Sequence, residues 1–293
     1  MKFKFNKQYL LFIKFFFIST FSLANCNQAL NHSRIVIAGG SLTEIVYLLG
    51  QEKKLVGVDV TSKYPLSAKK LTSIGYLRNL SSEGILSLSP TLLLAEDDIG
   101  PPAVLNQLNK TSLETKIISD DYTMVGVKNK IDCIVSILNL NKNNYLFAYN
   151  NIKEKIKKIE EYRFFNKKKN SKILLILMMR GTSPIIAGRN TSGHGLISSL
   201  GLLNSMSEVD GWKPVSKEEI ILSNPDYVIV TNRTFKSFSS SEDFILKTGL
   251  NFTNAGKNNN LIIEDGMALL GFGPRTLDVG IKISEIIAKW KFS

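Results

Sequence analysis

Cysteine and histidine are scarce in this chain of 293 residues, which contains two of each. Two cysteines, Cys26 and Cys133, are too few for a framework of disulfides or for a zinc site built on cysteine. Cys133 lies in the apolar helical pattern KIDCIVSIL, so we expect it to be a small buried hydrophobe. His32 precedes the first expected strand, and an enzyme that uses histidine as its base would therefore depend on His194.

Motifs of several enzyme classes are absent as well. The chain has no G-x-S-x-G elbow, no phosphate loop of the form G-x-x-x-x-G-K and no G-x-G-x-x-G after its first expected strand. The formal net charge is +12, but there is no basic stripe interleaved with aromatics. We therefore expect neither a nucleic-acid partner nor an enzyme. An exported α/β enzyme that uses His194, Asp97 or Asp98 stays open as an alternative.

Residues 1–25 have the pattern of an export signal, with a basic start, an apolar run and then small residues. Lys14 interrupts the apolar run, which is shorter than the roughly 20 residues that cross a bilayer as a helix. The segment carries four lysines and no acids, so its removal lowers the net charge from +12 to +8. We expect cleavage and a protein in the periplasm. Acylation at Cys26 is the alternative, although Asn25 is an unusual residue before such a site.

Strand and helix patterns alternate after the signal. RIVIAGG at 34–40 predicts a buried strand, and SLTEIVYLLG at 41–50 predicts a helix with Ser41 as N-cap and Glu44 as its capping-box partner. Further strands are expected at 54–60, 91–98 and 115–121, and an amphipathic helix at 124–140. This alternation predicts an α/β lobe with a largely parallel sheet, which we place at 31–141.

The stretch 142–169 contains apolar residues at helical spacing and many charges, without glycine or proline. It predicts one long helix that is exposed over much of its surface. A second α/β pattern follows at 170–293. We therefore expect two Rossmann-like lobes joined by a long helix, with a ligand in the cleft between them near the carboxyl ends of the strands.

The stretch SIGYLRNLSSEG at 73–84 places Tyr76 and Arg78 in an expected loop beside that cleft. Tyrosine is one of the axial ligands that haem iron accepts in proteins. Its reference pKa is near 10, so binding at neutral pH needs the charge of ferric iron and of a neighbouring guanidinium. The pair is chemically suited to ferric haem. Because Tyr-x-Arg is common by chance, the residues alone leave the ligand open.

Four stretches resemble the haem-binding proteins of bacterial ABC importers: IAGGSLTEIVYLLG, IGYLRNLSSEGILSLSPTLLLA, GTSPIIAGRNTSGHGLISSLGLLN and DGMALLGFGPRT. The resemblance covers nearly the whole mature chain. It implies a helix-linked, two-lobed binding protein without enzyme activity, which carries ferric haem as its transported ligand. It further implies Tyr76 as the axial ligand and Arg78 as its support. Arg233 would meet a haem propionate through charge-assisted hydrogen bonds, or else be a solvated loop charge.

Other expectations also rest on this resemblance. Met179 stands where some relatives have a histidine, and it would ligate the iron or pack with Met178 against the porphyrin. Glu83 and Glu218 match the glutamates that such proteins present to arginines of a membrane permease, with Glu219 as the alternative in the second lobe. The expected partners are haem and the ABC permease with its ATPase, with an outer-membrane haem receptor upstream, and the protein would be a monomer.

Two alternatives stay within binding proteins. Cobalamin or a ferric siderophore would occupy the same cleft, and neither ligand needs a tyrosine on its metal. The loss of a haem spectrum on replacement of Tyr76 would distinguish them from haem.

Overall fold

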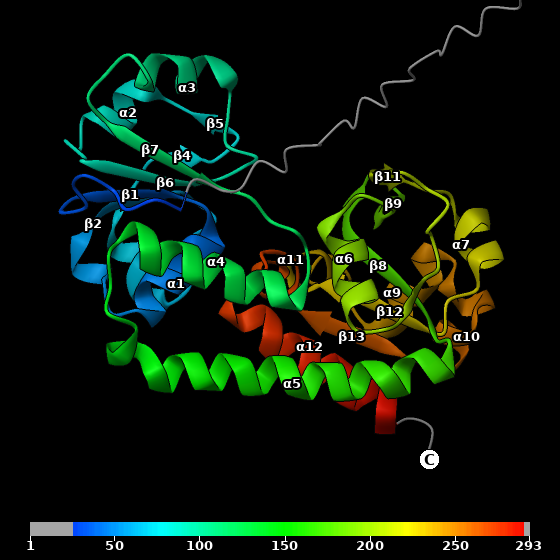
Figure 1. The fold of residues 1–293 in the computed structure, drawn as a ribbon. Coiled ribbons are helices and arrows are strands. Elements are labelled where there is room, and N and C mark those ends of the chain that lie inside the picture. Colours follow the sequence, from blue (N-terminus) through cyan, green and yellow to red (C-terminus); the bar gives the residue numbers. More distant parts are fainter. Residues whose placement is uncertain (1–25, 290–293) are drawn as a thin grey trace, which may run out of the picture.

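The computed structural model describes residues 26–289, so the expected export signal lies outside the described residues. Two α/β lobes lie side by side, and a long helix runs along both of them (Figure 1). Within 26–289 no helix has both the length and the apolar character needed to cross a membrane.

The N-terminal lobe is built on a five-stranded sheet with the order β3-β2-β1-β6-β7, in which every neighbouring pair is parallel. Its strands are β1 (Ile35–Ala38), β2 (Leu55–Val58), β3 (Thr72–Ser73), β6 (Leu92–Glu96) and β7 (Glu114–Ile118). Its helices are α1 (Gly40–Leu48), η1 (Glu52–Lys54), η2 (Leu66–Lys70), α2 (Ser82–Leu86), α3 (Pro102–Leu108) and α4 (Met124–Ile137).

Both faces of this sheet are covered, which explains why β1 and β6 are continuous apolar runs rather than alternating ones. Because successive side chains of a strand point to opposite faces, Ile35 and Ile37 join one buried cluster while Val36 and Ala38 join another. The sequence prediction of buried parallel strands is confirmed.

The C-terminal lobe has a six-stranded sheet with the order β11-β9-β8-β12-β13, and β10 pairs with β8. Its strands are β8 (Lys172–Arg180), β9 (Ser183–Ala187), β10 (Leu203–Asn204), β11 (Trp212–Pro214), β12 (Tyr227–Thr231) and β13 (Leu261–Glu264). The β8–β9 and β9–β11 pairs are antiparallel and the other pairs are parallel. Its helices are α6 (Ser192–Ser199), α7 (Lys217–Ser223), α8 (Asn232–Phe235), α9 (Ser241–Thr248), η4 (Leu250–Phe252), α10 (Asn254–Lys257), α11 (Gly266–Leu270) and α12 (Pro274–Lys289).

The linking helix is α5 (Leu146–Lys169), with 24 residues, and a 3₁₀ turn, η3 (Lys142–Tyr145), precedes it. It therefore begins four residues later than we expected. Ile152, Ile159 and Asn166 are its buried residues, and they recur every seven positions, so a narrow seam of the helix faces the lobes. The fold class of two lobes joined by a long helix is confirmed, and the sequence-based lobe boundaries stay predictions.

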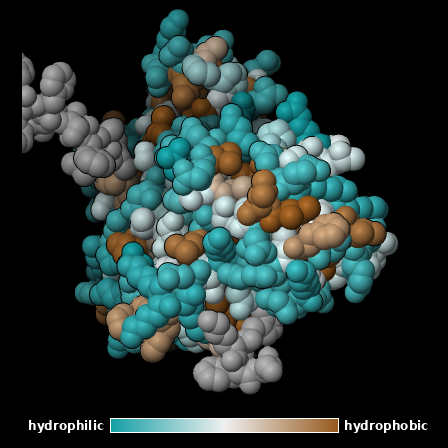
Figure 2. All heavy atoms as spheres, turned by 90° about the vertical axis from the view of Figure 1, so that its right-hand side faces the viewer, coloured by the Kyte–Doolittle hydropathy of each residue, from teal (hydrophilic) through white to brown (hydrophobic). Residues whose placement is uncertain are grey.

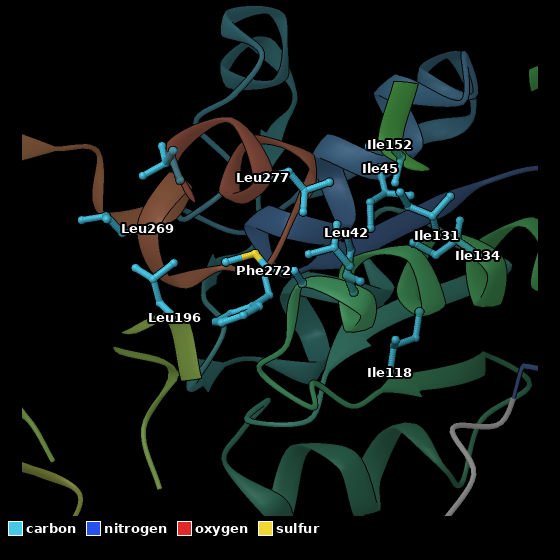
Figure 3. Close-up of a cluster of buried hydrophobic side chains, with 14 of the residues drawn as sticks. Leu42, Ile45, Ile118, Ile131, Ile134, Ile152, Leu196, Leu269, Phe272 and Leu277 are labelled. Atoms are coloured by element: carbon cyan, nitrogen blue, oxygen red, sulfur yellow. The ribbon is translucent and has the colours of Figure 1, made fainter. Parts of the chain in front are cut away.

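A single buried apolar cluster passes from one lobe to the other. Figure 3 shows Leu42 of the N-terminal lobe near Phe272 and Leu277 of the C-terminal lobe, and all three belong to one buried cluster. Phe272 is fully buried. Interfaces that are large and apolar hold domains in one arrangement. The relative placement of the lobes is thus part of the folded core.

Ion pairs reinforce this contact between the lobes. Arg275, on α12, donates to Glu44 Oε1 from Nε at 2.9 Å and from Nη2 at 2.6 Å, and it donates to Asp265 Oδ1 at 3.1 Å. The Glu44 side chain is only 4% exposed, and the Arg275 guanidinium lies over the Tyr64 ring. Burial raises the pKa of Glu44, and Arg275 opposes that shift.

The predicted capping box of Ser41 and Glu44 is wrong. α1 begins at Gly40 after Gly39, and no side chain caps it. Ser41 Oγ instead donates to Glu96 Oε1 at 2.6 Å, and Glu44 accepts hydrogen bonds from Arg275. Both polar side chains follow β1 and serve contacts between distant segments, which outweigh the local capping pattern.

Cys133 is buried, as the sequence predicted, but it also forms a disulfide with Cys26, a pairing that the sequence analysis did not foresee. The described chain begins by packing along α4: Ala29 is buried and donates its N–H to the Ile137 carbonyl at 2.9 Å. This path brings Cys26 to Cys133, 107 residues away in sequence. No local pattern signals such a long-range pairing.

Loss of this disulfide is expected to lower the free energy of unfolding by about 2–4 kcal/mol, because it closes a long loop in the unfolded chain. Urea denaturation of the wild type and of the Cys26→Ser/Cys133→Ser variant would measure the difference. Reductant should destabilise the wild type and leave the variant unchanged. Equal stability of both proteins under oxidising conditions would contradict a disulfide here.

Candidate functional site

Tyr76 lies on a short β-hairpin, where the sequence had predicted a loop. β4 (Gly75–Tyr76) pairs antiparallel with β5 (Asn79–Leu80), and Leu77 and Arg78 form the turn. Gly75 has a φ of 92°, a conformation that glycine adopts without strain. Strands of two residues are too short to leave a periodic pattern in the sequence, which is why the hairpin was missed.

The hairpin is fixed to the segment that follows β6. Gly100 donates its N–H to the Leu77 carbonyl at 2.8 Å and accepts from the Leu80 N–H at 2.9 Å. Leu77 and Leu80 are buried, whereas the Tyr76 side chain is exposed. The apolar side chains therefore anchor the hairpin and leave the Tyr76 ring accessible to a ligand.

Tyr76 and Arg78 are in contact, as the sequence predicted. Arg78 Nη1 donates to Tyr76 Oη at 2.5 Å, and Arg78 Nη2 makes a second, charged hydrogen bond to Asp98 Oδ2. Burial opposes the charge of Arg78, but Asp98 and Tyr76 raise its pKa above the usual value. A guanidinium that donates to a phenol oxygen favours the phenolate form, which is the form that binds ferric iron.

A second polar network lies at the carboxyl ends of β6 and β7, where the lobes meet. Lys130 Nζ contacts Ser41 Oγ at 2.8 Å, Asp120 Oδ1 at 2.6 Å and the Gly271 carbonyl at 3.2 Å. Ser41 in turn donates to Glu96. Desolvation raises the pKa of Glu96 to about 7, although Lys130 and Ser41 oppose the shift. The network joins strand ends of one lobe to the other lobe.

Glu96 makes stability depend on pH. Its pKa in the folded chain, about 7, lies above the usual glutamate value near 4.5, so between these pH values the folded chain holds a proton that the unfolded chain has lost. The folded chain is therefore stabilised by this bound proton at low pH, and that stabilisation is lost as the pH rises from about 5 to 7. In urea denaturation series, the free energy of unfolding of the wild type should fall by roughly 2 kcal/mol more over this pH range than that of the Glu96→Gln variant. An unchanged pH slope in the variant would show that Glu96 does not bind this proton.

Arg233 and Met179 lie near the carboxyl ends of strands in the C-terminal lobe. Arg233 is exposed on α8, directly after β12. Met179 is partly exposed near the end of β8, opposite Pro184 of β9, and the adjacent Met178 is 49% exposed. Among residues 26–289 neither side chain has a hydrogen bond or ion pair that joins it to Tyr76 or Arg78. The structure thus shows a direct contact between Tyr76 and Arg78.

Glu83 and Glu218 are exposed in the first turns of α2 and α7. The neighbouring Glu219 accepts the Ser216 N–H at 2.6 Å in a capping box. Its carboxylate is thus used within the helix, and Glu218 is the better placed of the two for an external partner.

Exposed apolar side chains accompany Glu218 on the outer side of the C-terminal lobe. Leu222 of α7 is 83% exposed, and Leu246 and Phe252 of the neighbouring α9 and η4 are also exposed. Figure 2 views the molecule from this side and shows hydrophobic groups surrounded by hydrophilic surface.

Both histidines of the chain have polar neighbours in the structure. His194 Nδ1 lies 3.2 Å from Asn204 Nδ2, and His32 Nδ1 lies 3.0 Å from Lys54 Nζ. In the range 26–289 no three histidine, cysteine or acidic side chains are grouped so that they could hold a metal ion. Two hollows of about 300 and 420 Å³ lie on the C-terminal lobe, and Tyr76 lines neither of them.

Comparison with known proteins gives two kinds of curated relative. The chain is 26% identical over 201 residues to an uncharacterized ABC transporter substrate-binding lipoprotein, YvrC, of Bacillus subtilis, covering 68% of this chain. That match spans only 63% of the length of YvrC. The chain is also 29% identical over 209 residues to a vitamin B12-binding protein of Yersinia pestis, covering 68% of this chain and 69% of the relative.

Solved structures and a family model complete the comparison. The periplasmic heme-binding protein HutB of Vibrio cholerae is 32% identical, with a TM-score of 0.77 over 88% of this chain and 99% of that chain. A family model described as a periplasmic binding protein matches residues 35–266, which is most of the chain. The two-lobed fold, its long linking helix and this match agree, and the chain therefore belongs to the periplasmic binding protein family.

Proposed function

We propose that this protein binds ferric haem in the periplasm and delivers it to the permease of an ABC importer. The observation that carries the proposal is the contact of Arg78 Nη1 with Tyr76 Oη at 2.5 Å, on a hairpin whose tyrosine ring is exposed. A cation beside the phenol favours the phenolate form, which is the form that binds ferric iron. The likeness to HutB supports haem as the ligand.

Each predicted site residue has a role in this proposal. Tyr76 binds the iron as phenolate, and Arg78 stabilises its negative charge. Arg233 meets a haem propionate from the second lobe by charge-assisted hydrogen bonds. Met179 covers part of the porphyrin, because a thioether side chain packs well against an aromatic face. The cargo leaves chemically unchanged, so the protein is a carrier and not an enzyme.

Delivery requires a docking surface on each lobe. Glu83 and Glu218 are exposed at the starts of α2 and α7, where they would pair with arginines of the permease. The exposed Leu222 beside Glu218 adds apolar contact area. Charge pairs of this kind govern partner choice and association rate more than affinity. The permease with its ATPase is the partner, and the protein acts as a monomer.

We further propose that the mature protein is free in the periplasm and carries no lipid. Lipid attachment would need the sulfur of Cys26, which is already bonded to Cys133. The intact mass of the protein purified from cells should equal that of the disulfide-bonded polypeptide without a lipid. A mass increased by a diacylglyceryl group would contradict this assignment.

Cobalamin is the second candidate ligand, because a vitamin B12-binding protein is among the relatives. Titration of the purified mature chain with haemin and, separately, with cyanocobalamin distinguishes the two. We expect saturable binding of haemin with a shifted Soret band, and no heat of binding with cyanocobalamin. Binding of cyanocobalamin without binding of haemin would overturn the proposal.

A further inference from the structure

Arg78 has two partners, and only one of them is explained by iron binding. Its Nη1 donates to Tyr76 Oη, while its Nη2 donates to the carboxylate of Asp98, which follows β6. Nothing in the sequence pattern links Asp98 to the tyrosine, because the two acids Asp97 and Asp98 look equivalent there. The structure separates them: among the described residues, the ion pair with Arg78 is made by Asp98.

Stability does not account for this ion pair. The side chains of Arg78 and Asp98 are 58% and 37% exposed. Exposed ion pairs contribute little to stability, because water screens the attraction and the long side chains lose freedom. We therefore look for the effect of the ion pair in the orientation that it gives to the Arg78 guanidinium.

The backbone keeps Asp98 and the hairpin in one register. Gly100, two residues after Asp98, makes hydrogen bonds with both Leu77 and Leu80, one on each side of Arg78. A Cβ added at Gly100 would lie 3.4 Å from the Arg78 carbonyl oxygen, so the two segments are in close contact. Asp98 and Arg78 thus belong to one rigid unit.

The planar guanidinium then acts as a fixed link between two oxygens. One edge is held by the carboxylate of Asp98, and this leaves Nη1 directed at the Tyr76 hydroxyl. Without Asp98, the exposed Arg78 side chain is free to turn into water, and the Tyr76 oxygen loses its donor. The effect of Asp98 on the tyrosine is indirect.

We infer that Asp98 is a positioning residue of the haem site: it holds Arg78 in the orientation that stabilises the phenolate of Tyr76. This inference rests on the proposed function. It predicts that orientation matters more than the negative charge. An asparagine at this position keeps an oxygen acceptor for Arg78, whereas an alanine removes it.

Haemin titration and the phenolate-to-iron charge-transfer band test the inference. We expect both Asp98→Ala and Arg78→Ala to raise the Kd for haemin about tenfold and to weaken the band. Asp98→Asn should stay within about threefold of the wild type. The Asp98→Ala/Arg78→Ala double variant should bind haemin no more weakly than Arg78→Ala alone, because both changes remove the same interaction of Arg78 with Tyr76.

Asp97→Ala is the matched control, since it removes a neighbouring acid that makes no ion pair with Arg78. It should bind haemin as the wild type does. The positioning role is wrong if Asp98→Ala keeps the wild-type Kd and band, or if Asp97→Ala weakens haemin binding as much as Asp98→Ala does. The proposed function would stand in either case. If the wild type itself does not bind haemin, the proposed function fails.

Discussion

Replacing Tyr76 with phenylalanine is expected to weaken ferric haem binding by about 100-fold. The change removes only the hydroxyl group, which lies 2.5 Å from Arg78 Nη1 and is the oxygen proposed to bind iron. Partners that merely support a metal ligand are typically worth 10–100-fold in affinity, so loss of the ligand itself should reach at least the upper end of that range. Titration of both proteins with haemin, followed at the Soret band, measures the ratio of the two Kd values.

Tyr145→Phe provides the control for this experiment. Tyr145 lies in the turn before α5, and its hydroxyl accepts a hydrogen bond from Gln51 Nε2. Its loss should leave haem affinity unchanged. Equal affinity of the wild type and the Tyr76→Phe variant would show that iron takes its ligand elsewhere.

Replacing Arg275 with methionine is expected to lower the free energy of unfolding by about 3–5 kcal/mol. The change leaves Glu44 buried between the lobes without its cation, and a buried unpaired charge is among the costliest defects in a folded protein. Urea denaturation at pH 8, where carboxylates are ionised in the unfolded chain, would measure the loss.

The Glu44→Gln/Arg275→Met variant separates charge from packing. Because it removes both charges, it should be more stable than Arg275→Met alone. Lys247→Met breaks a pair with Asp243 within α9, in which the lysine side chain is 60% exposed, and it should change stability little. If Arg275→Met is no less stable than Lys247→Met, the ion pair does not support the contact between the lobes.

The elements that could be predicted from sequence are those with strong periodic patterns. β1 and β6 are apolar runs covered on both faces, and α4 and α5 have helical spacing over many turns. The pairing of Tyr76 with Arg78 was also expected, because a guanidinium near a tyrosine favours its charged form and the Tyr-x-Arg stretch resembles that of haem-binding proteins.

The features that were missed depend on residues far apart in the chain. Cys26 finds Cys133 only because the first described residues pack along α4. Ser41 and Glu44 fit a capping box locally, but Glu96 and Arg275 bind them in the fold. Asp98 reaches Arg78 because backbone hydrogen bonds place the hairpin beside β6. Sequence spacing carries no information on such contacts until the topology is known.

The most direct test of haem capture by Tyr76 is the resonance Raman spectrum of the ferric haem complex, excited in its charge-transfer band. The protein would be prepared with ordinary tyrosine and with ring-deuterated tyrosine. Phenolate vibrations that are enhanced in the wild type, shift on deuteration and vanish in Tyr76→Phe are the predicted result. A haem complex without such vibrations, or one whose vibrations persist in Tyr76→Phe, would contradict the account.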